Sequence, residues 1–410
     1  MSKKKTDKKK SPYPENGRVK IRHSYYTFAR EFPSKILPLE GKRRKHRKSR
    51  IIKSSLLCLL FVSLSLFSYF TVNLLLDISY TDKEKLEASA VTDASDETDT
   101  QPEPALPFGG ENVKALYMPA EKLGDREYIK SFIKQIKIRS CNSTVIDFKS
   151  SEGKLSYTSL NETAVSAGAS LFDNNTVRQA LDLFESEEIR VIARIYCFRD
   201  NTAAAGEPSM AVKYLDTDVN WIDPKAENGG ESRLNPLSKN ARKYLLSIID
   251  EVMQFKIDGI LLEEVSFPSG EYVSAATYPG EKKGTDRNAV LKAFVEDVRE
   301  TLPDSCLLLL GHSANDILEA NRELYYGSML KSAADGFSVN TSERPEGITV
   351  DKKTGFASVL SLFSSLKNST GEKKAVYGID SSEYSASLLR KMQKAGYKDF
   401  IIYSPEGIYK

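Results

Sequence analysis

Short apolar runs alternate with amphipathic stretches along most of the chain. Eight runs are rich in Val, Ile, Leu, Tyr and Phe, which is typical of buried parallel strands because helices cover the outside of such sheets. The runs cover residues 113–119, 143–150, 189–198, 258–267, 306–313, 336–341, 374–380 and 399–405. They predict eight strands.

The stretches between these runs place apolar residues three or four positions apart, which predicts helices. The clearest are residues 126–139, 175–188, 241–255, 287–302 and 385–396. Eight strands alternating with helices predict an α/β fold, a (β/α)8 TIM barrel over residues 113–410. An open doubly wound sheet is the alternative. No G-x-G-x-x-G motif follows a strand, so no dinucleotide cofactor is expected.

A different pattern precedes the barrel. The 23 residues from Ser54 to Leu76 carry no charge, and a helix of that length can cross a hydrocarbon core of about 30 Å. We therefore expect a transmembrane signal-anchor helix over residues 51–77. A cleaved signal peptide is the alternative, but its apolar region and the basic segment before it are normally shorter.

Charge is divided across this expected span. Residues 1–50 hold 18 Lys and Arg against four acidic residues, a balance of +14, so the total of +3 leaves −11 for the remainder. Basic segments stay in the cytoplasm and are attracted to anionic membrane lipid. We expect a disordered cytoplasmic arm over residues 1–50, an acidic Pro-bearing linker over 78–112 and an extracytoplasmic barrel in the cell membrane of a bacterium.

The same division argues against a nucleic-acid partner, because an acidic body repels phosphates. Cys141, Cys197 and Cys306 cannot all pair, so buried free thiols are favoured over a disulfide framework. The chain has three His and no H-x-x-x-H, and no metal site is expected.

Polar residues cluster at the carboxyl ends of the predicted strands, where barrels carry their chemistry. Strict alternation places Asp147 and Lys149 on one side of their strand and turns Glu263 and Glu264 opposite ways. Ionisable groups inside apolar runs are paired or functional. The set Asp147, Lys149, Arg194 and Glu263 is therefore either an internal ion-pair network or part of an active site.

At this point the sequence resembles a bacterial family of glycoside-hydrolase-like TIM barrels, formerly of unknown function. Three segments carry the likeness: V-I-D-x-K-x-x-x-G, V-I-A-R-x-x-x-F-x-D and F-D-x-I-x-x-D-Y-V-R-F-P. The residues that match are Asp147, Lys149, Gly153, Arg194, Phe198, Asp200, Asp258, Val265, Phe267 and Pro268. Glu263 replaces the usual Asp of the family, Glu264 and Ser266 replace its flanking Tyr and Arg, and an aromatic, His-bearing sixth-strand ending is absent.

The resemblance implies carbohydrate metabolism, with a polysaccharide or cell-wall glycan as substrate and two carboxylates acting across the scissile bond. Glu263 is the first candidate, and Asp147, Asp380 and Glu264 follow in falling order as its partner. The substrate-binding candidates are Lys149, Arg194, Tyr196, Asp200, Trp221, Glu264, His312 and Tyr403. The departures from the family pattern keep an alternative open, a catalytically degenerate barrel that serves as a surface glycan-binding or scaffold protein.

Overall fold

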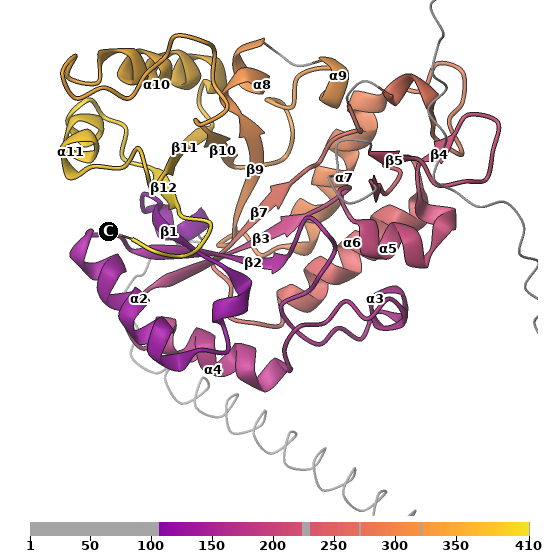
Figure 1. Ribbon diagram of the computed structural model, residues 1–410, viewed down its shortest axis with the longest axis horizontal. Coiled ribbons are helices and arrows are strands. Elements are labelled where there is room, and N and C mark those ends of the chain that lie inside the picture. Colours follow the sequence, from indigo (N-terminus) through magenta and orange to yellow (C-terminus); the bar gives the residue numbers. More distant parts are fainter. Residues whose placement is uncertain (1–105, 224–229, 270–271, 320–321, 410) are drawn as a thin grey trace, which may run out of the picture. The chain divides into compact units, whose positions relative to one another are not determined.

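Eight parallel strands close into a barrel in the computed structural model of the protein (Figure 1). Strands that follow one another in the chain lie side by side, and the last strand pairs with the first. The barrel strands are β1 (Lys114–Met118), β2 (Ser143–Lys149), β3 (Arg190–Tyr196), β7 (Gly259–Glu263), β9 (Leu307–Ser313), β10 (Gly336–Asn340), β11 (Lys374–Asp380) and β12 (Phe400–Tyr403). The prediction of eight strands in a closed α/β barrel is confirmed, and the open sheet is excluded.

The structure describes residues 106–223, 230–269, 272–319 and 322–409. The basic arm, the expected membrane span and nearly all of the linker lie outside these residues and stay predictions. Within the described ranges, none of the helices combines the length and the apolar character needed to span a membrane. Cys141, Cys197 and Cys306 are free thiols; Cys197 and Cys306 are buried, as expected, whereas Cys141 is only partly buried.

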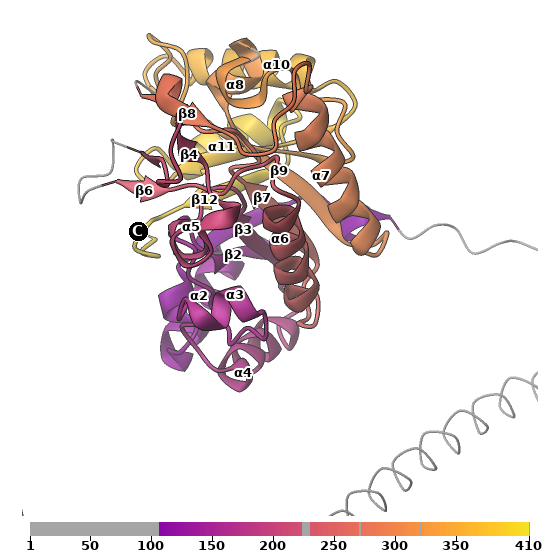
Figure 2. The same cartoon turned by 90° about the vertical axis from the view of Figure 1, so that its right-hand side faces the viewer.

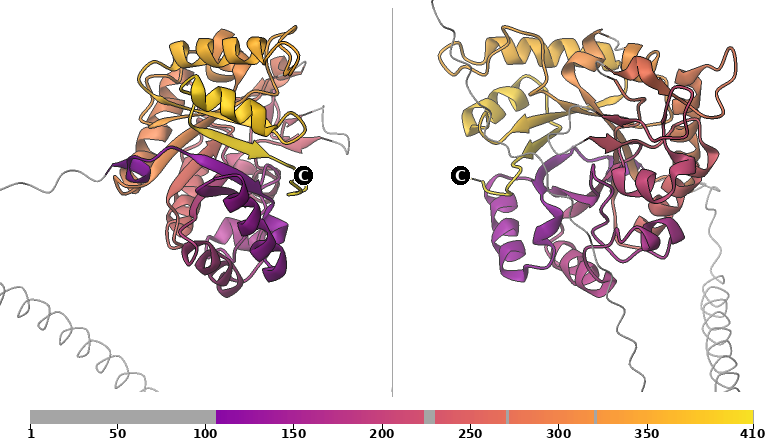
Figure 3. Two further views of the ribbon diagram at one scale, coloured as in Figure 1. Left: turned by 90° about the vertical axis from the view of Figure 1, so that its left-hand side faces the viewer. Right: turned by 45° about the vertical axis from the view of Figure 1, so that its right-hand side comes forward.

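Helices cover the outside of the barrel (Figures 1 and 3). Asp125, Asp173, Ser238, Asp286 and Ser385 each accept a backbone N–H at the start of the helix that follows, which explains where these five helices begin. The longer helices are α2 (Arg126–Ile138), α4 (Asn174–Glu185), α6 (Lys239–Val252), α7 (Arg287–Thr301), α10 (Ala357–Thr370) and α11 (Ala386–Lys394). All but α10 were predicted.

Shorter elements occupy the connections. The short helices are α3 (Glu162–Ser166), α5 (Asn201–Gly206), α8 (Ala314–Glu319) and α9 (Arg322–Tyr325), with 3₁₀ turns η1 (Pro107–Gly110), η2 (Ala120–Lys122), η3 (Pro208–Met210) and η4 (Val273–Ala275). Two antiparallel pairs join β4 (Lys213–Tyr214) to β8 (Ala276–Thr277) and β5 (Ile222–Asp223) to β6 (Glu231–Ser232). Figure 2 shows β4, β6 and β8 gathered at one side of the barrel.

The barrel has two hydrophobic layers. A large cluster fills the space between strands and helices, and a smaller one fills the interior. The interior cluster consists of Phe108, Val113, Ala115, Tyr117, Val145, Ile192, Leu261, Leu307, Leu309, Val376 and Ile401. Phe108 in η1 reaches this cluster from the chain segment before β1, and its backbone N–H donates to the Ser305 carbonyl. The interior is therefore a packed core, and a ligand can enter only beyond its last apolar layer.

Candidate active site

Alternation along the strands determines which side chains lie beyond the last apolar layer. Side chains two residues beyond Val145, Ile192 and Leu261 point to the same side as these core residues. Those positions hold Asp147, Arg194 and Glu263. The apolar interior therefore ends in a layer of ionisable groups at the carboxyl ends of the strands.

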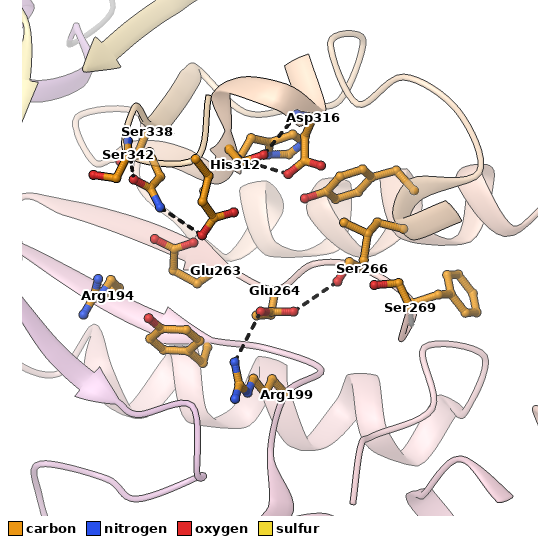
Figure 4. Close-up of a pocket in the computed structure, with 18 of the residues that line it drawn as sticks. Arg194, Arg199, Glu263, Glu264, Ser266, Ser269, His312, Asp316, Ser338 and Ser342 are labelled. Atoms are coloured by element: carbon orange, nitrogen blue, oxygen red, sulfur yellow. Dashed lines mark hydrogen bonds and ion pairs between the residues drawn. The ribbon is translucent and has the colours of Figure 1, made fainter. Parts of the chain in front are cut away.

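A pocket of about 520 Å³ opens at this end of the barrel (Figure 4). Seven of the sequence-predicted site residues line it: Arg194, Tyr196, Glu263, Glu264, His312, Asp380 and Tyr403. Asp147, Lys149, Asp200 and Trp221 are not among its lining residues.

Glu263 is half-buried at the end of β7 and faces this pocket. Its carboxyl group occupies space that a side chain at position 311 of the neighbouring strand would fill, since a Cβ there would lie 1.8 Å from Oε2. Burial raises the pKa of Glu263 to about 7; Arg194 opposes this shift, whereas the charges of Glu264, Asp147 and Glu343 add to it. Within the described part of the chain, no side chain forms an ion pair with Glu263. A carboxylic acid that keeps its proton near neutral pH can act as a general acid.

Glu264 lies in the same pocket, contrary to the expectation that it faces away from Glu263. The reason is its backbone: with φ at 54° it leaves the strand conformation in which neighbours alternate. Its Oε2 lies 3.2 Å from Nη1 of Arg233, and its Oε1 lies 3.9 Å from Nη1 of Arg199. Figure 4 shows Glu264 between Arg199 and Ser266. A non-glycine residue in the left-handed region is strained, and such strain concentrates at functional sites.

Arg194, which lines the pocket, forms an ion pair with Asp147, which does not. Nη2 of Arg194 donates to Oδ2 of Asp147 at 3.0 Å, and the Tyr117 hydroxyl donates to the same oxygen at 2.8 Å. The guanidinium also lies over the rings of Tyr117, Tyr196 and Tyr403, 4.6–5.4 Å from their centroids. Burial alone would lower the pKa of Arg194, but the charge and hydrogen bond of Asp147, together with Tyr196 and Tyr403, outweigh it and the pKa is raised. These contacts hold Asp147 away from the pocket, so it is a poor second carboxylate.

Lys149 belongs to a separate ion pair, which corrects the expected four-residue network. Its Nζ lies 2.8 Å from Oδ2 of Asp200, both side chains are fully buried, and Nζ also donates to the Tyr196 carbonyl. Asp200 accepts from the Tyr244 hydroxyl of helix α6 and from the backbone of α5. A register shift between Asp147 and Lys149 breaks the alternation that would have placed them on one side.

Gly153 completes this second pair. Its φ is +90°, and a Cβ there would lie 2.0 Å from Oδ1 of Asp200. Lys149, Gly153 and Asp200, three of the residues that carry the family resemblance, thus fasten the loop after β2 to the start of α5. Their position indicates a structural role at the rim of the barrel.

The remaining candidates have distinct environments. The Trp221 ring, a substrate-binding candidate, is fully buried, and its indole N–H donates to the Tyr272 carbonyl. His312 is buried against Tyr325, with ring centroids 4.5 Å apart, and burial lowers its pKa to about 4. Asp380 accepts from the backbone and hydroxyl of Ser382. Burial raises the pKa of Tyr403 to about 12.

The pocket residues that were not predicted include Arg233, Gly311, Asp316 and Glu343. Asp316 and Glu343 lie in α8 and in the loop after β10, where no strand alternation marks a side chain as pocket-facing. Gly311 could have been noticed as a small residue two positions beyond Leu309. Among the described residues, no group of three or more His, Cys, Asp and Glu side chains is arranged to hold a metal ion.

A closed (β/α)8 barrel with a protonatable carboxyl and a charged pocket at its carboxyl end has the arrangement of a barrel enzyme. Residues 115–310 match a family model described as "Putative glycosyl hydrolase domain". The resemblance drawn from the sequence is therefore confirmed, and the barrel carries a glycosyl-hydrolase-like domain over these residues. No protein with a curated description matches the chain in sequence.

Several solved structures are similar to the chain. A hypothetical protein from Ruminiclostridium thermocellum is 25% identical, with a TM-score of 0.42 over 48% of this chain and 96% of its own. An uncharacterized protein from Listeria monocytogenes is 14% identical, with a TM-score of 0.48 over 73% of this chain and 29% of its own. A GH20 exo-β-N-acetylglucosaminidase from Vibrio harveyi is 10% identical, with a TM-score of 0.43 over 65% of this chain and 41% of its own.

Proposed function

We propose that the barrel is a glycoside hydrolase in which Glu263 is the general acid and Glu264 the second carboxylate. The observation that carries this proposal is the difference in electrostatic environment between Glu263 and Glu264. Burial raises the pKa of Glu263 to about 7, whereas Glu264 is ion-paired with Arg199 and Arg233 in the same pocket. When two carboxyl groups have such different environments, the one that keeps its proton acts as the acid and the ion-paired one acts as the ionised partner.

The proposed reaction follows from these positions. Glu263 donates its proton to the glycosidic oxygen as the bond from that oxygen to the anomeric carbon breaks. The carboxylate of Glu264 stabilises the positive charge that develops on the sugar ring. Water supplies the hydroxyl group to the anomeric carbon, and its remaining proton passes to a carboxylate. Glu264 takes precedence over Asp147 because Arg194 and Tyr117 engage Asp147.

The test is hydrolysis by the full chain in detergent micelles, assayed on polysaccharides and cell-wall glycans. We expect Glu263→Gln to abolish turnover and Glu264→Gln to reduce it more than Asp380→Asn does. Glu300→Gln is the matched control, because Glu300 is exposed on helix α7 outside the pocket. Turnover that survives Glu263→Gln would remove Glu263 from the mechanism. Glycan binding without turnover by the unaltered protein would favour the degenerate glycan-binding barrel instead.

We also propose that the barrel lies outside the cell membrane, held by one helix over residues 51–77. The uncharged run from Ser54 to Leu76 and the preceding basic arm support this topology. Protease added to intact cells should digest the barrel and spare residues 1–50. Digestion of the arm but not of the barrel would show that the orientation is the opposite of the one proposed.

A further inference from the structure

The pocket has more acidic than basic side chains on its wall. Its three cationic side chains already have carboxylate partners: Arg194 pairs with Asp147, Arg199 with Glu231, and Arg233 with Asp223, while Arg199 and Arg233 also share Glu264. The other acidic residues on its wall are Glu263, Asp316, Glu343 and Asp380. No further Lys or Arg among the described residues lines the pocket.

Glu343 is the clearest uncompensated charge. It lies in the loop after β10, and its Oε1 accepts a hydrogen bond from the Asn340 side-chain amide at 3.2 Å. No ion pair to Glu343 forms within the residues that the structure describes. Glu343 is exposed on the pocket wall, and its partial burial raises its pKa. The nearby charges of Asp316 and Glu264 add to this shift, and the hydrogen bond from Asn340 opposes it. A positive charge placed beside Glu343 would offset the repulsion from Asp316 and Glu264.

His312 provides a second, independent feature of the same pocket. The residue is 8% exposed, and its buried Nδ1 atom has no hydrogen-bond partner among the described residues. Burial lowers its pKa to about 4 although the charge of Asp316 opposes this shift, and a neutral imidazole supplies no positive charge. Figure 4 shows His312 beside Asp316, on the same wall of the pocket. A buried polar atom without a partner is costly unless a ligand satisfies it.

We propose that the pocket binds a glycan containing an unacetylated amino sugar, whose ammonium group pairs with Glu343 while a polar group of the same sugar bonds to Nδ1 of His312. This inference rests on the proposed function and specifies its substrate class. A neutral sugar would bury the Glu343 charge without compensation. A uronic acid would be repelled by the acidic wall. An ammonium group forms a charge-assisted hydrogen bond with a carboxylate.

The test compares matched ligands on one protein. The full chain carrying Glu263→Gln, in detergent micelles, is titrated calorimetrically with glucosamine and galactosamine oligomers of several linkages. Each oligomer is compared with its fully N-acetylated form. We expect at least one free-amine oligomer to bind about tenfold more tightly than its acetylated form, as a charge-assisted hydrogen bond allows.

Variants locate the effect. Adding Glu343→Gln should remove the preference by weakening only the free-amine form. Glu346→Gln, an exposed residue three positions further along the same loop and outside the pocket, should leave it unchanged. If no linkage shows a preference for the free amine, or if Glu343→Gln weakens both forms equally, the inference is overturned.

The two proposals fail in different ways. Hydrolysis of any glycan that Glu263→Gln abolishes would uphold the proposed function even if free amines are not preferred. Amine-selective binding that depends on Glu343, with no hydrolysis by the unaltered protein, would uphold the binding inference and overturn the hydrolase.

Discussion

The contact between Glu263 and Gly311 allows a quantitative prediction about Gly311→Ala. The new Cβ would lie 1.8 Å from Oε2 and 2.3 Å from Cδ of Glu263, whereas ordinary contacts begin at 3.4 Å. The carboxyl group must therefore move by about 1.6 Å. Because the displaced atoms are the end of a flexible side chain, the barrel can adapt, and we expect a stability loss of about 1 kcal/mol, the low end for an added core methyl.

The effect on activity should be much larger. A misplacement of about 1 Å can cost about a hundredfold in rate, which corresponds to roughly 2.7 kcal/mol of transition-state stabilisation. We therefore expect kcat/KM for glycan hydrolysis to fall about a hundredfold, with Tm lowered by only a few degrees. Retention of kcat/KM within twofold of the unaltered protein would refute the reasoning.

Two further variants distinguish a displaced Glu263 carboxyl group from a general loss of stability. Gly259→Ala lies at the opposite end of β7, where a Cβ would meet the Leu307 carbonyl oxygen at 3.2 Å. Because the atom in contact belongs to the backbone, it cannot move aside as easily as the end of a side chain. Gly259→Ala should therefore lower the stability of the protein, while the molecules that fold keep their activity. Adding Glu263→Asp to Gly311→Ala shortens the acid by about 1.5 Å. This second change should restore part of the lost activity, a non-additive result expected of residues in contact.

Three other predictions concern charge. The pKa of Glu263 is about 7 in the folded protein against an ordinary 4.5. As the pH rises from 4.5 through 7, the free energy of unfolding of the unaltered protein should therefore fall by up to about 3 kcal/mol relative to that of Glu263→Gln. Urea unfolding of both proteins at pH 4 and pH 8 measures this change, and the same stability difference at both pH values would contradict the prediction. Asp147→Asn removes a negative charge near Glu263 and leaves Arg194 unpaired, and both changes lower the pKa of Glu263. The alkaline limb of the pH–rate profile should therefore shift to lower pH. The control is Asp335→Asn, which breaks an ion pair with Arg299 away from the pocket. Lys149→Met leaves Asp200 buried without its partner and should cost about 3–5 kcal/mol in urea unfolding, and a loss below 1 kcal/mol would show that the pair is not a structural lock.

The barrel could be predicted because its strands are continuous apolar runs bounded by polar ends. Five helices were equally clear, since each combines apolar spacing with a capping Asp or Ser. Helix α10 has the same spacing, burying Val359, Leu362, Phe363 and Leu366, but lacks the start signal. Its N-terminal neighbour is Phe356, which has a φ of 65° and no capping side chain. Without a capping side chain, the sequence does not mark where this helix begins.

The site was predictable only where strand alternation holds. It places Glu263 and Arg194 correctly beyond the apolar interior. It fails at Lys149, where the register shifts, and at Glu264, where the backbone becomes left-handed. Both departures depend on local backbone geometry that residue types do not reveal. Glu343 was missed for another reason: it lies in a loop, and only the folded barrel brings that loop to the pocket.

The replacement of Asp by Glu at position 263 bears on whether the site is degenerate. A longer acid at the end of β7 would collide with most side chains on the adjacent strand, yet Gly311 leaves that space empty and the carboxyl group fills it. The extra length of about 1.5 Å is close to the displacement that a Cβ at position 311 would impose. The longer acid and the glycine are therefore matched to each other. This fit is expected if Glu263 is the general acid that we propose, with a reach different from that of the Asp in the family pattern.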